Sequence, residues 1–425
     1  MGWNSWDAYG LTLDEGQFKA NARIVAGLKR SGWRYVVIDE GWYMGDPLGE
    51  TLQSRDYRLD GHGLLTPARE HFPSAADGQG FRRLAAWTHA RGLKFGIHIV
   101  RGIPKAAVEA NLPIAGSRFH ASDAADRKAT CPWDDGNFGV GDNAAGQAWY
   151  DSMLKLYADW GVDFLKVDCI ADHPYRGSEI RQIARAIART RRPIVLSLSP
   201  GPTQLSHAQE VSTLADMWRI ANDLWDGWSF THSHPEDDFP NGVRVMFDDL
   251  ARWNPHAAPG HWPDPDMLPF GRLAPHPGWG EPRRTRLSSE EERALFTLDA
   301  IARSPLILGG DLATYDRAER TMIANTEVIA LDQGRRSSRP VTELPGELAQ
   351  ARVWVSTPLG ATGPNTIAVF NLGDAPMQVG VPWEALGLGA GAPAARELWT
   401  GQRLSRSRTA SFAVPAHGVA LYRLS

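Results

Sequence analysis

The feature that most constrains the fold is a regular alternation of short apolar segments with segments of helical periodicity, which fills the first three quarters of the chain. This alternation is typical of a parallel sheet whose strands are connected by crossover helices. The candidate strands are residues 1–4, 34–39, 94–100, 163–168, 193–199, 217–220, a weak segment that ends near Asp264, and 304–308. Eight strands, each followed by a helix or a long loop, predict an α/β fold of the (β/α)₈ barrel type, in which functional sites lie at the carboxyl ends of the strands.

Some of the intervening helices carry start or stop signals. Thr12 and Glu15 have the spacing of a capping box, and Gly32 is the expected stop of the helix that follows. Ser288 and Glu291 have the same spacing ahead of another helical segment. These signals support helices between the predicted strands.

After Gln333 the pattern changes to short alternating segments separated by Gly, Pro and polar turns. These segments are residues 352–356, 366–371, 377–381, 395–399, 411–414 and 419–424. They predict a small antiparallel β-sandwich. We therefore expect a barrel domain over residues 1–334 and a β-sandwich domain over residues 335–425, with the boundary near residues 334–340.

Three long segments, residues 43–80, 101–142 and 229–262, contain no predicted strand and are rich in Gly, Pro, Asp and His. On a barrel they are expected to form loops, and loops of this length are usually functional.

Charge and hydropathy restrict the class of partner. Lys and Arg number 45 and Asp and Glu 49, a net charge of −4, which argues against binding of nucleic acid or an anionic membrane surface. No stretch approaches the roughly 20 apolar residues of a membrane span, and the N-terminal segment lacks a signal-peptide pattern. We expect a soluble protein, located in the cytoplasm, or in the periplasm or outside the cell if a leader precedes Met1. The 17 Trp residues are either core residues or platforms on which sugar rings stack.

Several predicted strands end in acidic residues. These are Asp39 and Glu40 after the second strand, Asp168 after the fourth, Asp223 after the sixth, and Asp264 and Asp266 after the seventh. Carboxylates crowded at one mouth of a barrel repel one another and shift one another's pKa values, a cost tolerated mainly where they perform acid/base or nucleophilic chemistry. Lys166 and Arg219 are expected to face the same mouth. An acidic pocket with aromatic residues and no phosphate-binding glycine loop suits a sugar.

Seven motifs, in one order and over essentially the whole chain, carry a family resemblance. They are residues 1–6 (MGWNSW), 38–42 (IDEGW), 166–168 (KVD), 218–223 (WRIAND), 262–268 (WPDPDML), 304–311 (SPLILGGD) and 325–330 (NTEVIA). The chain resembles glycoside hydrolase family 27, the α-galactosidase family. Residues 95–104 (FGIHIVRGIP) resemble a bacterial subgroup that includes β-L-arabinopyranosidases.

The resemblance implies a retaining exo-glycosidase that acts by double displacement on terminal α-D-galactopyranosyl residues or on β-L-arabinopyranosyl residues of the same ring stereochemistry. It implies that Asp168 is the nucleophile and Asp223 the acid/base. The family's sugar-binding positions correspond to Trp6, Asp39, Glu40, His98, Lys166, Arg219 and Asp266. The implied partner is a small glycoside, an oligosaccharide or a polysaccharide, with no cofactor and no metal.

The residues themselves agree with these two roles. A retaining glycosidase needs one ionised carboxylate for attack at the anomeric carbon and a second, protonated carboxyl group for the leaving oxygen. Lys166 is expected to keep Asp168 ionised, and Asp223 is expected to be desolvated between Trp225 and Trp228.

Three departures from the family pattern stand out. Ser199 and Pro200 replace the Glu-Trp that many members carry after the fifth strand, so recognition of the 2-hydroxyl is expected at Ser199 or at a loop. The family's disulfide cysteine lies two positions after the nucleophile, whereas Cys169 lies one position after Asp168. We therefore expect a buried free thiol rather than a bridge between Cys131 and Cys169.

The third departure is the replacement of the family's Asp-Asp pair by Asp39 and Glu40. The additional methylene of Glu40 extends its carboxyl group toward the volume in which C6 of a galactoside would lie. This predicts a preference for β-L-arabinopyranosides, which have no C6. The alternative is a conservative replacement in a plain α-galactosidase.

Two other classes of function remain open. His232 and His234, followed by acidic residues 236–238, offer ligands for a metal-dependent hydrolase. They lie in a Pro-containing insertion rather than on rigid strand ends, which makes a catalytic metal the remote alternative. A non-catalytic carbohydrate-binding protein would be expected to lack one of the two catalytic carboxylates, and both are present.

Overall fold

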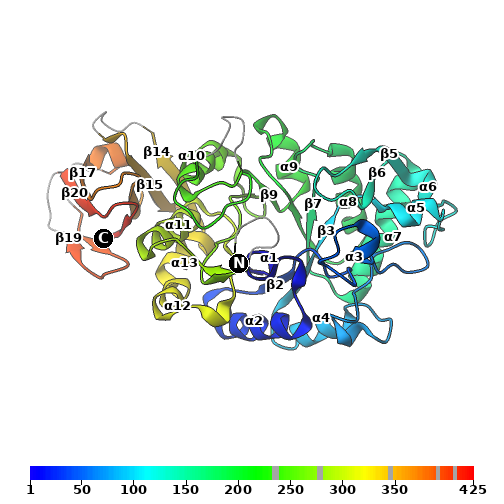
Figure 1. Ribbon diagram of the computed structural model, residues 1–425. Helices are drawn as coiled ribbons and strands as arrows, with labels where there is room; N and C mark the ends of the chain where they lie inside the picture. The colour runs from blue at the N-terminus through cyan, green and yellow to red at the C-terminus, as the bar shows by residue number, and fades with distance from the viewer. Residues whose placement is uncertain (232–238, 275–280, 343–347, 389–392, 405–408) are drawn as a thin grey trace.

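The computed structural model describes residues 1–425 except 232–238, 275–280, 343–347, 389–392 and 405–408. It contains a barrel and, beside it, a smaller β-domain drawn in orange and red that ends at the C-terminus (Figure 1). Helix α11 (Ser289–Ala302) of the barrel packs against strands of the β-domain.

Eight parallel strands form the barrel sheet, in the order β10-β9-β8-β7-β3-β2-β1-β13. Their bounds are β1 Gly2–Asn4, β2 Tyr35–Ile38, β3 Lys94–Val100, β7 Phe164–Asp168, β8 Val195–Leu198, β9 Met217–Arg219, β10 Trp262–Asp264 and β13 Ile307–Leu308. A parallel bridge between Leu268, after β10, and Leu308, in β13, joins the two ends of the sheet. All eight strands predicted from the sequence are confirmed, and so is the (β/α)₈ fold class.

Helices surround the sheet. Besides α11 they are α1 Trp6–Tyr9, α2 Glu15–Leu28, α3 Leu52–Arg55, α4 Arg82–His89, α5 Lys105–Glu109, α6 Ala121–Ala124, α7 Ala144–Trp160, α8 Gly177–Thr190, α9 Ala208–Leu214, α10 Val243–Trp253, α12 Arg317–Ile323 and α13 Thr326–Gln333. In the described part of the chain, none of the helices has the length and apolar character needed to span a membrane.

The first helix begins later than its predicted cap. Asp14, not Thr12, caps α2, with its side chain accepting from the amide of Gln17 at 2.8 Å while its own amide donates to Gln17 at 2.9 Å. The hydroxyl of Thr12 instead donates to the carbonyl of Tyr9 at 2.8 Å and closes a 3₁₀ turn over Gly10–Thr12. The capping box of Ser288 with Glu291 is confirmed, and Gly32 ends its helical segment with a left-handed φ of 104°.

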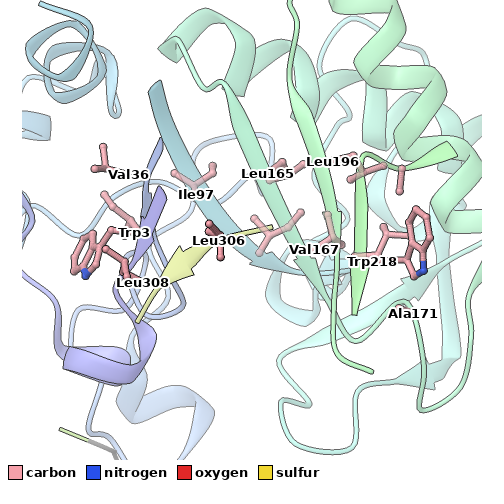
Figure 2. Close-up of a cluster of buried hydrophobic side chains, with 14 of the residues drawn as sticks. Trp3, Val36, Ile97, Leu165, Val167, Ala171, Leu196, Trp218, Leu306 and Leu308 are labelled. Carbon is pink, nitrogen blue, oxygen red and sulfur yellow. The ribbon is translucent and has the colours of Figure 1, made fainter. Parts of the chain in front are cut away.

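Alternating strand side chains divide into two layers. Val36, Ile97, Leu165, Val167 and Trp218 are buried in the large core outside the sheet, where Figure 2 shows them with Trp3 and Leu308. Their strand neighbours, among them Val37, Phe164, Met217 and Ile307, form a separate small cluster inside the barrel. Because side chains alternate with a period of two, Lys166, Asp168 and Arg219 lie on the inner face. Asp168 and Arg219 are the last residues of their strands and so lie at the mouth of the barrel.

The three segments predicted to be strand-free contain more structure than expected. Within residues 101–142, β4 Ile103–Pro104, β5 Ala125–Thr130 and β6 Asn137–Val140 form a three-stranded antiparallel sheet, and α10 lies within residues 229–262. The prediction was wrong for 101–142 because β5 (ADRKAT) is mostly polar and solvent-facing and so lacks apolar alternation. A short hairpin of β11 Arg272–Leu273 and β12 Arg283–Arg284 follows β10.

The C-terminal domain is an antiparallel β-sandwich, as predicted. One sheet has the order β14-β15-β16-β21-β18-β19 and the other pairs β17 with β20. The bounds are β14 Arg336–Val341, β15 Ala351–Pro358, β16 Thr366–Asn371, β17 Met377–Pro382, β18 Ala395–Glu397, β19 Arg403–Leu404, β20 Thr409–Val414 and β21 Val419–Leu424. Strands β14 and β19 were not predicted, and the division of the chain at residue 334 stays a prediction.

Candidate active site

The residues predicted to form the site come from the carboxyl ends of seven neighbouring strands. His98 lies in β3, Lys166 and Asp168 in β7, and Arg219 at the end of β9. The strand register places His98 beside Lys166, and Lys166 beside Ser197 of β8. The others lie one to four residues after the ends of strands: Trp6 follows β1, Asp39 and Glu40 follow β2, Ser199 follows β8, Asp223 follows β9 and Asp266 follows β10.

Asp39 is the most heavily hydrogen-bonded carboxylate of the mouth. Its Oδ2 accepts from Nδ2 of Asn4 at 2.7 Å and from Nζ of Lys166 at 2.8 Å, and its Oδ1 accepts from the amide of Glu40 at 2.9 Å. Burial alone would raise the pKa of Asp39, but the charges of Lys166 and His98 and these hydrogen bonds hold it well below its usual range. Asp39 is therefore an anion that can accept from sugar hydroxyls.

Asp168 is held ionised by a different set of groups. Its Oδ1 accepts from the amide of Cys169 at 2.8 Å, and Nε2 of His98 lies 3.5 Å from its Oδ2. Burial opposes ionisation, but His98, the charge of Lys166 and the Cys169 amide together lower the pKa of Asp168. The lowered pKa agrees with the ionised state that was expected for Asp168. Lys166 contributes through its charge, because its direct ion pair is with Asp39.

Asp223 and Asp266 are joined by one guanidinium group. Nη2 of Arg219 lies 3.1 Å from Oδ1 of Asp223 and 2.9 Å from Oδ2 of Asp266. Asp266 also accepts from the amide of Leu224 at 2.9 Å. Burial raises the pKa of Asp266, Arg219 opposes the shift, and the charge of Asp223 adds to it.

The expected desolvation of Asp223 is not what the structure has. Its side chain remains 30% exposed, while Arg219 is 3% exposed. Trp225 is buried and Trp228 is partly buried, stacked 4.3 Å from the ring of His417 in the β-domain. Asp223 therefore faces the open mouth with Arg219 on one side, a position that leaves it accessible to a leaving group and to water.

The remaining predicted residues frame the mouth. Ser199 is buried, and its amide donates to the carbonyl of Val167 at 2.9 Å. Trp6 is partly buried and packs against the cluster inside the barrel. Most tryptophans of the described chain belong to the core, while Trp133 is 44% exposed.

Glu40 has a partner that the sequence did not reveal. Its side chain is hydrogen-bonded to that of Asp134, which lies between β5 and β6. Burial, followed by the charge of Asp134, raises the pKa of Glu40 well above its usual range. The abundance of Asp and Gly in residues 101–142 was the only signal for Asp134, and nothing in it pointed to Glu40.

Cys131 and Cys169 form a disulfide, which corrects the expectation of a free thiol. The prediction relied on the offset of Cys169 along the chain from Asp168, the predicted nucleophile. It was wrong because Cys169 adopts a left-handed φ of 60°, which turns the backbone, and the two Cα atoms lie 6.0 Å apart, within bridging range.

Buried Arg101, not predicted as a site residue, braces this bridge. Its Nε donates to the carbonyl of Cys169 at 2.7 Å, its Nη2 to the carbonyl of Thr130 at 3.3 Å, and its Nη1 to Glu179 at 3.0 Å. Arg101 thus connects Cys169, the residue after Asp168, with Thr130, the residue before Cys131. The residues of the metal hypothesis, His232, His234 and residues 236–238, lie outside the described part of the chain.

A barrel whose mouth holds two ionised carboxylates, a third carboxylate open to solvent, and basic residues beside them has the groups that acid/base and nucleophilic chemistry on a glycoside needs. Comparison with known proteins agrees. A family model described as alpha galactosidase A matches residues 131–334, and one for the alpha galactosidase C-terminal beta sandwich domain matches residues 349–424. The chain belongs to glycoside hydrolase family 27.

Individual relatives differ in their specificity. A β-L-arabinopyranosidase of this family from Geobacillus stearothermophilus, solved in complex with arabinose, is 38% identical, with a TM-score of 0.90, over 100% of this chain and 96% of that chain. A putative α-N-acetylgalactosaminidase from Bacillus halodurans is 34% identical, with a TM-score of 0.85, over 100% and 96%. Alpha-galactosidase A of Cellvibrio japonicus is 28% identical over 100% of this chain and 91% of its own.

Proposed function

We propose that this glycoside hydrolase is a retaining exo-glycosidase for terminal β-L-arabinopyranosyl and α-D-galactopyranosyl residues, with a preference for the former. The observation that carries the proposal is the contrast between two carboxylates at one mouth. Asp168 is held ionised among buried donors, whereas Asp223 is partly exposed and is oriented by Arg219. A double displacement needs this division of roles.

In the first step Asp168 attacks the anomeric carbon and forms a glycosyl ester, while Asp223 gives a proton to the glycosidic oxygen as the bond to the leaving group breaks. In the second step Asp223, now a carboxylate, takes a proton from water, which displaces Asp168. The contact with Arg219 orients the carboxylate for this base role. Two inversions at the anomeric carbon retain its configuration.

The surrounding polar groups suit a pyranose ring. The ionised Asp39 and the ammonium of Lys166, 2.8 Å apart, present an acceptor and a donor side by side for vicinal hydroxyls. Arg219 and Asp266 offer a second such pair. Ser199 lies at the end of the neighbouring strand, where we assign the 2-hydroxyl, and Trp6 supplies an apolar face.

The preference for arabinopyranosides rests on Glu40. Its carboxyl group extends one methylene beyond that of an Asp, toward the volume in which C6 of a galactoside would lie. A missing or crowded methylene-sized group changes specificity by roughly 10–200-fold. The 38% identity to an arabinopyranosidase supports this direction.

A plain α-galactosidase is the second candidate, because curated relatives such as that of Cellvibrio japonicus carry this name. A comparison of kcat/KM on 4-nitrophenyl β-L-arabinopyranoside and 4-nitrophenyl α-D-galactopyranoside, with one enzyme preparation, separates the two. We expect the arabinopyranoside to equal or exceed the galactoside. A galactoside preference of about tenfold or more would favour the plain α-galactosidase.

A further inference from the structure

Glu40 lies against an acidic side chain from a distant part of the chain. The side chains of Glu40 and Asp134 are hydrogen-bonded to each other, and they are only 9% and 5% exposed. Two buried carboxyl groups in contact share one proton, because two anions at this separation would repel each other. The edge of the candidate site therefore contains a carboxyl group, that of Glu40, whose pKa is raised by burial and by the neighbouring Asp134.

The other contacts of Asp134 occupy its two oxygens. The hydroxyl of Tyr57 donates to Oδ2 of Asp134 at 3.0 Å, and the amide of Gly136 donates to its Oδ1 at 2.8 Å. Both oxygens of Asp134 therefore accept from other groups, and burial together with the neighbouring Asp134 favours the protonated form of Glu40, which can donate to Asp134.

Asp134 is itself held in place from two sides. The disulfide of Cys131 with Cys169 ties its segment to the end of β7, next to Asp168. On the other side, the ring of Tyr57 packs edge-on against the buried ring of Tyr43 at 4.9 Å. These contacts fix the position of the Asp134 side chain, which is the partner of Glu40.

We propose that Asp134 is the positioning residue for sugar specificity: it holds Glu40 in the conformation that excludes the hydroxymethyl group of a hexopyranose. This inference rests on the proposed role of Glu40 as the residue that reads C6. An Asp at position 40 falls short by one carbon–carbon bond, about 1.5 Å, and loses the contact with Asp134. Without Asp134, Glu40 is free to rotate aside and admit C6.

The test uses the ratio of kcat/KM for the arabinopyranoside to kcat/KM for the galactoside, both as 4-nitrophenyl glycosides. Because both values come from one preparation, the ratio does not depend on the fraction of active enzyme. The variants are Asp134→Ala, Glu40→Asp and the double variant. Asp135→Ala is the matched control, since Asp135 is the next residue, is 72% exposed and pairs with Lys105 at 2.9 Å.

We expect Asp134→Ala to lower the ratio by about fivefold or more, and Glu40→Asp to lower it comparably. The double variant is expected to differ from Glu40→Asp by less than about twofold, because Asp134 acts through the longer side chain. Asp135→Ala should leave the ratio within about twofold of the wild-type value. Tyr57→Phe, which removes one donor to Asp134 and keeps the ring, should lower the ratio by a smaller factor.

An unchanged ratio in Asp134→Ala, with a lowered ratio in Glu40→Asp, would overturn the role of Asp134 and leave that of Glu40 intact. An equal further fall in the Glu40→Asp background would also overturn it, because Asp134 would then act independently. An unchanged ratio in Glu40→Asp would overturn both the inference and the proposed reading of C6. If Asp134→Ala does not fold, Tyr57→Phe decides, and an unchanged ratio there rejects the proposal.

Discussion

Lys166 and Asp39 form a buried ion pair across the barrel mouth, with Nζ 2.8 Å from Oδ2 and side chains that are 13% and 2% exposed. Asp168, which lies two residues after Lys166 on the same strand, receives its hydrogen bond from the amide of Cys169 instead. The primary counter-ion of Lys166 is therefore the sugar-binding candidate rather than the proposed nucleophile.

Breaking this pair from one side should be costly. Lys166→Met leaves the Asp39 carboxylate buried without its cation and is expected to lower the free energy of unfolding by about 3 kcal/mol. Urea titration is the measurement. The double variant with Asp39→Asn should recover at least half of the loss, because no buried charge is left uncompensated. Losses that simply add would contradict the ion-pair account.

Asp299, in α11, predicts a pH dependence of stability. It is fully buried, and neither carboxyl oxygen has a hydrogen-bond partner within the described residues. Burial, with the nearby charges of Asp264 and Asp332, raises the pKa of Asp299 well above its usual range. Above pH ~4 the folded chain therefore keeps a proton on Asp299 that the unfolded chain has lost. The free energy of unfolding consequently decreases as pH rises.

Asp299→Asn should remove this dependence. Relative to the wild type, the variant is expected to gain on the order of 1 kcal/mol in free energy of unfolding between pH 5 and pH 7, with little difference near pH 3.5, where Asp299 is protonated in both states. Parallel urea titrations at these pH values test it. A difference that does not change with pH would mean that Asp299 is ionised in the folded protein.

Much of the fold could be predicted because apolar strand segments alternate with helices, a pattern set by local sequence. Strand β5 was not predicted, because its side chains face solvent and show no apolar alternation. The start of α2 was misplaced because a 3₁₀ turn intervenes and Asp14 supplies the cap. Local patterns therefore identify buried elements better than exposed ones.

For the site, strand-end residues could be named because parallel strands bring their carboxyl ends to one mouth. Asp134 and Arg101 could not, since their partners depend on how a long segment returns to the barrel. The same holds for the disulfide, where the turn at Cys169 brings Cys131 into range despite the unfavourable spacing. Contacts made through long loops are not encoded in local periodicity.

The disulfide should contribute to stability and to activity. It closes a loop with a sequence separation of 38 residues, for which loop-closure entropy corresponds to about 4 kcal/mol. Replacing Cys131 and Cys169 by Ser is expected to lower the free energy of unfolding by about 3 kcal/mol. It should also lower kcat/KM, because the segment beside Asp168 is released. A double variant with unchanged stability would contradict the bridge.

The proposed acid role of Asp223 predicts a dependence on the leaving group. Asp223→Ala should strongly reduce kcat/KM on glycosides with poor, alkyl leaving groups, and far less on those with activated phenols, which depart with little protonation. A series of aryl and alkyl galactosides measures how kcat/KM depends on the pKa of the leaving group. An equal loss across the series would identify Asp223 as a binding residue.

The assignment of the two carboxylates is tested most directly by azide rescue, with the galactosyl azide identified by NMR. In Asp168→Ala, azide should attack from the vacated face of an activated α-galactoside and yield β-galactosyl azide, with no turnover in its absence. In Asp223→Ala, azide should instead displace Asp168 from the glycosyl-enzyme and yield α-galactosyl azide. Activity of Asp168→Ala without azide, or azides of exchanged configuration, would contradict Asp168 as the nucleophile.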